Sequence, residues 1–308
     1  MSSSKHQPTR RMTLSLLCGG ALNAFGGKQD FLLRSSANLV VLDVAVAGAD
    51  GIPLAGLTVD QFQIVENGRR QTIKQFSAEE APVSIGLVID MSGSMHSKLA
   101  GVRQATSTFL EASNPKDEYF LIGFNDRAWV GLPARMEFSS KRDDIRKALL
   151  GVRSAGKTAL YDGVALALKH VTGSRYERRV LVLITDGKDT ASALSWPEAL
   201  NLVRSSPVTI YTIGLFGEDE DSNRGVLKQL GKITGGRFYE PATPQAIESV
   251  CNTIARDIRA RYTIAYTPPA DARSTIRKIR VELLKAPGSP RATVRARSEY
   301  TLETLTDK

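Results

Sequence analysis

The middle of the chain alternates between short apolar runs and amphipathic stretches. Residues 85–89 and 180–184 are apolar at nearly every position, which is typical of strands buried on both faces of a sheet. The same reading predicts further strands over residues 118–126 and 208–216, and helices over residues 142–150, 160–171 and 244–259. Because strands that alternate with helices pair mostly in parallel, we expect a doubly wound α/β fold with helices on both faces of the sheet.

The two segments that flank this region have a different pattern. In residues 31–80 and 260–305, apolar side chains recur at every second position between turn-forming residues, as in half-buried strands. The dipeptide Asn67-Gly68 predicts a tight hairpin turn, and we expect Ile73 and Phe76 to lie on the strand that follows it.

Neither flanking segment is large enough to bury a core of its own. We therefore expect residues 31–80 and 260–305 to pair into one small β-sandwich. The α/β domain, residues 82–259, would then be an insertion between the two halves of that sandwich.

Small oxygen-bearing side chains follow both buried central strands. Asp90, Ser92 and Ser94 come directly after the first strand, and Asp186 follows the second. Thr158 lies at the start of the helix between them. Open α/β sheets bind ligands at the carboxyl ends of their strands, so these five side chains should meet at one edge. Two carboxylates and three hydroxyls suit Mg²⁺, Mn²⁺ or Ca²⁺ and disfavour zinc or copper.

The run DMSGS, the distant Thr158 and the later ITDG together resemble the metal-ion-dependent adhesion site of von Willebrand factor type A domains. The resemblance implies a Rossmann-like domain that binds Mg²⁺, or Mn²⁺ or Ca²⁺, and is not an enzyme. It also implies a protein partner whose acidic side chain completes the metal's coordination. The wider arrangement resembles exported bacterial proteins that carry such a domain between short β segments.

Two other classes of function stay open from the sequence. Residues 151–158 read GVRSAGKT, which matches the phosphate-binding P-loop, and Asp186 could then hold a nucleotide's Mg²⁺. A P-loop must follow a buried strand, however, and the residues before this one have helical spacing. Among the three histidines only His96 lies near the metal run, and we expect it to be a surface residue rather than a catalytic one. The remaining class is a structural envelope protein whose metal only stabilises the fold.

The N-terminus has the features of an export signal. Lys5, Arg10 and Arg11 precede a mild apolar stretch, which predicts a signal peptide over residues 1–26 and an exported protein, whether periplasmic, cell-surface or secreted. Its removal would leave Cys251 as the single cysteine, which we expect to be a buried small apolar residue. The rest of the chain has no apolar span long enough for a transmembrane helix.

The composition is that of a soluble globular chain with a sizeable core, since 42% of the 308 residues are hydrophobic and 24% are charged. The formal net charge is +9, and much of it comes from arginines after residue 255. We expect those arginines to line a solvated strand face. Without interleaved aromatic residues they do not predict nucleic-acid binding. An acidic envelope surface is a further partner that they would suit.

Overall fold

The computed structural model describes residues 39–187, 189–216, 223–270, 276–284 and 292–301. The predicted signal peptide, residues 1–26, lies outside these described residues. No helix in the described ranges is both long and apolar enough to cross a membrane.

The α/β domain is built on a six-stranded sheet with the strand order β10-β9-β8-β5-β6-β7. Its strands are β5 (Ser84–Asp90), β6 (Glu118–Phe124), β7 (Ala128–Val130), β8 (Arg179–Thr185), β9 (Thr209–Gly214) and β10 (Phe238–Tyr239). All neighbours pair in parallel except β7, which runs antiparallel to β6 at the edge. Every residue of β5 and β6 is buried, as the unbroken apolar runs predict.

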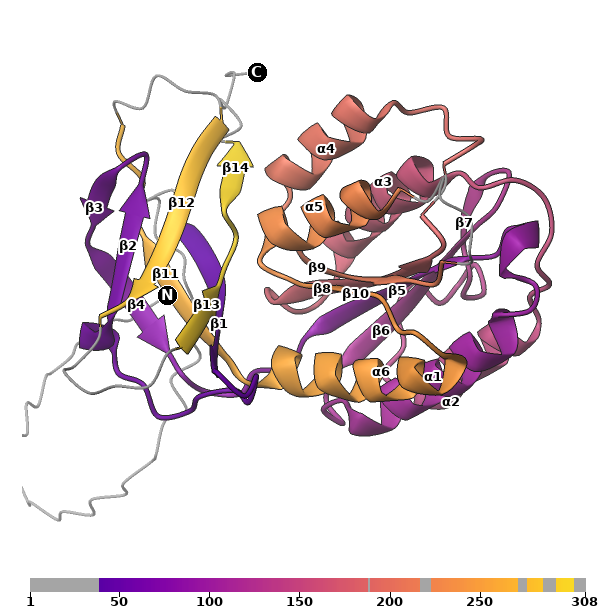
Figure 1. Ribbon diagram of the computed structural model, residues 1–308, viewed down its shortest axis with the longest axis horizontal. Coiled ribbons are helices and arrows are strands. Elements are labelled where there is room, and N and C mark those ends of the chain that lie inside the picture. Colours follow the sequence, from indigo (N-terminus) through magenta and orange to yellow (C-terminus); the bar gives the residue numbers. More distant parts are fainter. Residues whose placement is uncertain (1–38, 188, 217–222, 271–275, 285–291, 302–308) are drawn as a thin grey trace, which may run out of the picture. The chain divides into compact units, whose positions relative to one another are not determined.

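Helices cover both faces of this sheet. The helices are α1 (Leu99–Ala112), α2 (Arg142–Leu150), α3 (Leu160–His170), α4 (Trp196–Ser205), α5 (Arg224–Thr234) and α6 (Pro244–Arg259). Figure 1 shows α1, α2 and α6 on one face and α3, α4 and α5 on the other. Short 3₁₀ turns also occur at Val59–Gln61, Gly93–Met95 and Val171–Gly173. The expected doubly wound, mostly parallel α/β fold is confirmed.

The flanking segments form two antiparallel sheets, with the orders β13-β1-β11-β4 and β14-β12-β2-β3. The strands are β1 (Val40–Gly48), β2 (Phe62–Glu66), β3 (Arg69–Gln71), β4 (Ile73–Ser77), β11 (Arg261–Tyr266), β12 (Ile276–Leu283), β13 (Ala292–Arg295) and β14 (Glu299–Thr301). Each sheet contains strands from both ends of the chain, and one apolar cluster lies between the two sheets. The predicted sandwich, with the α/β domain as its insertion, is therefore present.

One detail of the first β segment differs from our expectation. Asn67 and Gly68 do form the tight turn, with φ of 47° and 82°. The strand after the turn ends at Gln71, however, and Ile73 and Phe76 lie on β4, which pairs with β11 in the other sheet. Phe76 lies 5.6 Å from Phe62, ring centre to ring centre, across the sandwich. The change of sheet at residue 72 places Phe76 against the shared core.

The expectation of a solvated arginine face is only partly right. Arg280 is exposed, but Arg261, Arg277 and Arg297 are buried. Each of the three donates hydrogen bonds to oxygen atoms; Arg277, for instance, donates to Glu66 at 2.8 Å. Only the Nε atoms of Arg261 and Arg277 are buried without a partner among these three guanidinium groups. Buried guanidinium groups are tolerated only with such partners, so these arginines have a structural role instead of forming a free basic surface.

Candidate metal centre

The carboxyl ends of the two central strands place the first candidate ligand deep in the sheet. Strands β5 and β8 pair so that Ile89 lies opposite Ile184, which brings Asp90 beside Thr185. Asp90 is fully buried and accepts hydrogen bonds from the Thr185 hydroxyl at 2.7 Å and from the Ser92 amide at 2.8 Å. These two bonds fix the orientation of the Asp90 carboxylate.

The turn after β5 brings two hydroxyl groups together. Ser92 and Ser94 flank Gly93, and their Oγ atoms are hydrogen-bonded to each other at 3.0 Å. An octahedral Mg²⁺ with ligands at about 2.1 Å would place neighbouring ligand oxygens about 3 Å apart. Ser92 is buried, whereas Ser94 is exposed. The pair therefore has the spacing of two neighbouring ligands and faces solvent on one side.

The loop that carries Thr158 lies directly against this turn. The Gly93 amide donates to the Gly156 carbonyl at 3.0 Å, so the two segments are in contact through their backbones. Thr158 itself is buried, and its backbone exchanges hydrogen bonds with Thr190: its amide donates to the Thr190 hydroxyl at 3.0 Å, and its carbonyl accepts from the Thr190 amide at 2.8 Å. Thr158 is thus held between the turn after β5 and the loop after β8.

Negative charge at this edge is only partly compensated. The Oδ1 atom of Asp186 is buried without a hydrogen-bond partner, and Oδ2 lies 3.7 Å from the Lys98 ammonium group. Burial, together with the nearby charge of Asp186, raises the pKa of Asp90 to about 6, against the opposing effect of its hydrogen bonds. A cation at this edge would offset both the unpaired oxygen and the repulsion between the carboxylates.

The donor set is made of oxygen atoms alone. Within the described ranges, no group of three or more His, Cys, Asp or Glu side chains is arranged to hold a metal. The five residues of the candidate site instead combine two carboxylates with three hydroxyls. Hard divalent cations such as Mg²⁺ accept such ligands, whereas zinc and copper prefer nitrogen and sulfur.

Comparison with known proteins identifies the domain. A family model described as von Willebrand factor type A domain matches residues 84–253, more than half of the chain. The chain belongs to the von Willebrand factor type A family. An uncharacterised protein from Borreliella burgdorferi is 28% identical over 182 residues, which are 56% of this chain and 52% of that protein. The chain thus spans about half the length of this curated relative.

Solved structures agree on the fold. A von Willebrand factor type A structure from Catenulispora acidiphila is 15% identical with a TM-score of 0.53, over 89% of this chain and 76% of that one. Proximal thread matrix protein 1 from the mussel byssus is 17% identical with a TM-score of 0.51, over 63% and 51% of the two chains. At these identities the matches show the fold alone.

Two aspartates that the sequence reading missed hold the loops of the type A domain in place. Asp189 accepts a hydrogen bond from the Leu160 amide at 2.8 Å at the start of α3. Asp126, just after β6, accepts from the Lys157 amide at 3.0 Å. Asp126 could have been noticed as a carboxylate that follows a buried strand, whereas the partner of Asp189 is too distant in sequence to be read from a local pattern.

The P-loop-like segment of the type A domain does not have the context of a P-loop. Residues 151–158 follow helix α2 instead of a strand. The amides of Ala155, Lys157 and Thr158, which would be needed to cradle phosphate, donate to the Met91 carbonyl, the Asp126 carboxylate and the Thr190 hydroxyl. Ser154, in the same segment, is hydrogen-bonded to the exposed His96. These contacts hold the segment against the loops of the candidate metal centre and disfavour nucleotide binding.

Proposed function

We propose that the type A domain holds a divalent cation and binds a protein partner through it, without catalysis. Mg²⁺ is the expected cation, and Mn²⁺ or Ca²⁺ could replace it. The proposed ligands, directly or through water, are Asp90, Ser92, Ser94, Thr158 and Asp186. An acidic side chain of the partner would complete the coordination.

The observation that carries this proposal is the unpaired, buried Oδ1 atom of Asp186 next to the buried Asp90. Buried carboxylates are costly unless they are paired, hydrogen-bonded or bound to a metal. Asp90 has hydrogen bonds from Ser92 and Thr185, but Oδ1 of Asp186 has none. A bound cation would satisfy that oxygen.

The choice of an acidic partner follows from the charge of the site. Three of the five proposed ligands are neutral hydroxyls, so the two carboxylates can at most neutralise the charge of a divalent ion. Lys98 already neutralises part of the charge of Asp186. The ion would therefore keep an attraction for a further anionic oxygen. Ser94 is exposed, which supports an approach from the solvent side of the turn.

We also propose that the protein acts outside the cytoplasm, in the envelope, at the cell surface or in the medium. This part rests on the predicted signal peptide over residues 1–26. It is tested by N-terminal sequencing of the mature protein, and retention of residues 1–26 in the cytoplasmic fraction would contradict it.

The metal site is tested by calorimetry on the full chain with Mn²⁺ and Mg²⁺. We expect binding in the unmodified protein, loss of binding in Asp90→Ala and Asp186→Ala, and unchanged binding in Asp143→Ala, which removes an exposed carboxylate on α2. Parallel titrations of Lys157→Ala, with and without ATP, test the nucleotide reading. Binding that requires both ATP and Lys157 would overturn the adhesion-type proposal.

A second measurement tests whether the ion can take an external carboxylate. Water bound to Mn²⁺ enhances proton relaxation, so acetate that displaces this water should lower the relaxivity of the Mn²⁺-loaded protein. If Mn²⁺ only raised the melting temperature and acetate had no effect, the ion would be a closed structural site and the partner-binding role would be wrong.

A further inference from the structure

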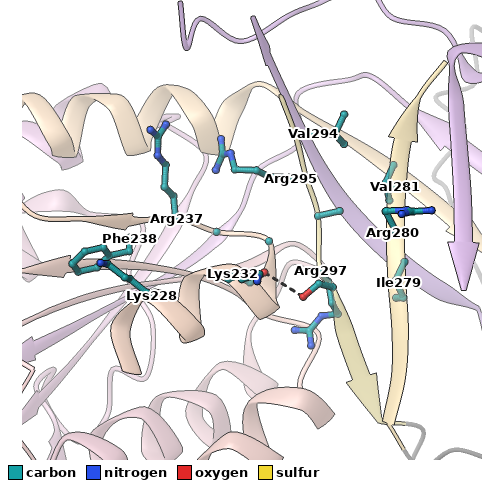
Figure 2. Close-up of a pocket in the computed structure, with 14 residues that line it drawn as sticks. Lys228, Lys232, Arg237, Phe238, Ile279, Arg280, Val281, Val294, Arg295 and Arg297 are labelled. Carbon is teal, nitrogen blue, oxygen red and sulfur yellow. Dashed lines mark hydrogen bonds between the residues drawn. The ribbon is translucent and has the colours of Figure 1, made fainter. Parts of the chain in front are cut away.

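A cavity of about 500 Å³ lies where the type A domain meets the β-sandwich, within the unit formed by residues 37–308. Figure 2 shows the side chains around it. One wall comes from α5 and the turn into β10, and the other comes from β12, β13 and the residues after β13. Neither the sequence patterns nor the proposed metal site involves this cavity.

Glycines allow the two domains to meet so closely here. Gly235 ends α5 with φ of 80°, and a Cβ atom at this position would lie 2.5 Å from the carbonyl carbon of Ala296. The Gly235 carbonyl accepts from Arg261 at 2.9 Å, and the Ser298 amide donates to the Ile233 carbonyl at 3.0 Å. These contacts hold the end of α5 against the β-sandwich.

The charged groups that line the cavity are all cationic. They are Lys228, Lys232, Arg237, Arg280, Arg295 and Arg297. Arg280 pairs with Glu282 and Arg295 pairs with Asp257, while Arg297 is surrounded by backbone carbonyls.

Three of these cations form no ion pair with any carboxylate that the structure describes: Lys228, Lys232 and Arg237. The cavity therefore has an excess of positive charge at its rim, which attracts anions.

Several of the cations are held in place before any ligand arrives. The Lys228 ammonium lies 5.6 Å from the centre of the Phe238 ring, and the Arg237 guanidinium lies 5.2 Å from that of Tyr239. The Arg295 guanidinium is held by its ion pair with Asp257.

The remaining wall of the cavity is apolar. Phe238 from β10 contributes to it, together with Ile279, Val281 and Val294, which belong to or pack against the sandwich core. A cavity of this volume, with an apolar wall and a cationic rim, is of the size that binds small molecules.

We propose that this cavity binds an organic phosphate: a small molecule with a phosphate group on an apolar body. The phosphate lies at the rim that carries Lys228, Lys232 and Arg237, and the apolar body lies on Phe238 and the sandwich residues. Phosphate fits better than a single carboxylate because its higher charge and three oxygens match several cations at once, and guanidinium groups bind it through paired hydrogen bonds.

The test uses the full chain in metal-free buffer, so that its result does not depend on the proposed metal site. The probe is fluorescent 1-naphthyl phosphate, compared with pyrophosphate, neutral 1-naphthol and hexaglutamate. The variant Lys228→Glu/Arg237→Glu reverses two exposed rim charges. Its matched control, Lys116→Glu/Lys147→Glu, makes the same change in net charge at exposed lysines that do not line the cavity.

We expect 1-naphthyl phosphate to bind the unmodified protein and the control within twofold of each other, and the rim variant at least tenfold more weakly. Equal affinity in the rim variant and the control would overturn the proposal. So would 1-naphthol that binds as tightly as its phosphate, because the charge would then be irrelevant. If pyrophosphate bound as tightly as 1-naphthyl phosphate, the apolar wall would not contribute to binding and the proposal would be wrong. If hexaglutamate bound more tightly than 1-naphthyl phosphate, the ligand would be an acidic peptide and not a small organic phosphate.

Discussion

Replacing Glu66 should destabilise the sandwich far more than replacing a half-exposed glutamate on the same sheet. Glu66 ends β2, is 1% exposed, and bonds to side chains from three strands of the C-terminal half. Arg277 donates to it at 2.8 Å, Tyr266 at 2.6 Å and Tyr300 at 3.1 Å. More than 200 residues separate Glu66 from Arg277, so this cluster directly joins the two halves of the sandwich.

The expected magnitude follows from what Glu66→Ala leaves behind. The Arg277 guanidinium would stay buried without its carboxylate, and removing one partner of a buried ion pair costs about 3–5 kcal/mol. Two tyrosine hydroxyls would also lose their acceptor. For a domain of this size, each kcal/mol lowers the melting temperature by about 2–4 °C, so the expected decrease is about 6–20 °C. Glu66→Gln keeps an acceptor oxygen and should cost less.

The assay is urea and thermal unfolding of the full chain, followed by circular dichroism. The matched control is Glu282→Ala, which removes the partner of Arg280 in a pair on β12 where the arginine side chain is 70% exposed. Such a pair contributes about 0–1 kcal/mol. If Glu66→Ala and Glu282→Ala destabilised the protein equally, the buried cluster would not be what joins the two halves, and the reasoning would be refuted.

Two further predictions concern single side chains. Lys98→Ala should tighten Mn²⁺ binding about two- to fivefold in calorimetry, because it removes a competing cation 3.7 Å from Asp186. Such an ion pair contributes up to about 1 kcal/mol. Equal Mn²⁺ affinity in Lys98→Ala and in the control Lys157→Ala would show that Lys98 does not compete with the metal. Burial raises the pKa of the Cys251 thiol to about 12, so in a Cys18→Ser background we expect no reaction with Ellman's reagent at pH 8 until the protein is unfolded in urea. Rapid labelling of the folded protein would show that this helix face opens.

The fold could be predicted where local pattern and burial agree. An unbroken apolar run is stable mainly at the centre of a parallel sheet, where both faces are buried. The runs of β5 and β8 both lie there. The change of sheet at residue 72 could not be predicted, because the alternation of apolar and polar residues continues through it. The strand that carries Phe76 is assigned to its sheet by a tertiary contact, the packing of Phe76 against Phe62.

The candidate site was readable for a similar reason. Asp90 and Asp186 follow buried strands, and strand ends on a parallel sheet meet whatever the length of the connections between them. The sequence did not predict the ion pair that partly neutralises Asp186. Its partner, Lys98, lies in the segment before α1, far from Asp186 in the sequence. The cationic cavity was also missed, because its residues come from α5, β12 and β13 and become neighbours only when the domains meet.

Ion pairs attach the end of α6, the last helix of the type A domain, to strands of the β-sandwich. Asp257, near the end of α6, is buried and bonds to Tyr211 in the sheet, to Arg261 on β11 and to Arg295 on β13. Against the effect of burial, the two guanidinium groups hold the pKa of Asp257 below its usual value.

Moving the end of α6 away from these partners would break buried ion pairs at a cost of about 3–5 kcal/mol. Coupling between distant sites typically amounts to only about 1–3 kcal/mol. Coupling to the proposed cation site would therefore supply too little energy to pull this end of α6 free. Any movement of α6 has to occur at its other end, around Thr243, or carry β11 and β13 with it. Because Arg295 also lines the cationic cavity, a ligand there would share the same anchor.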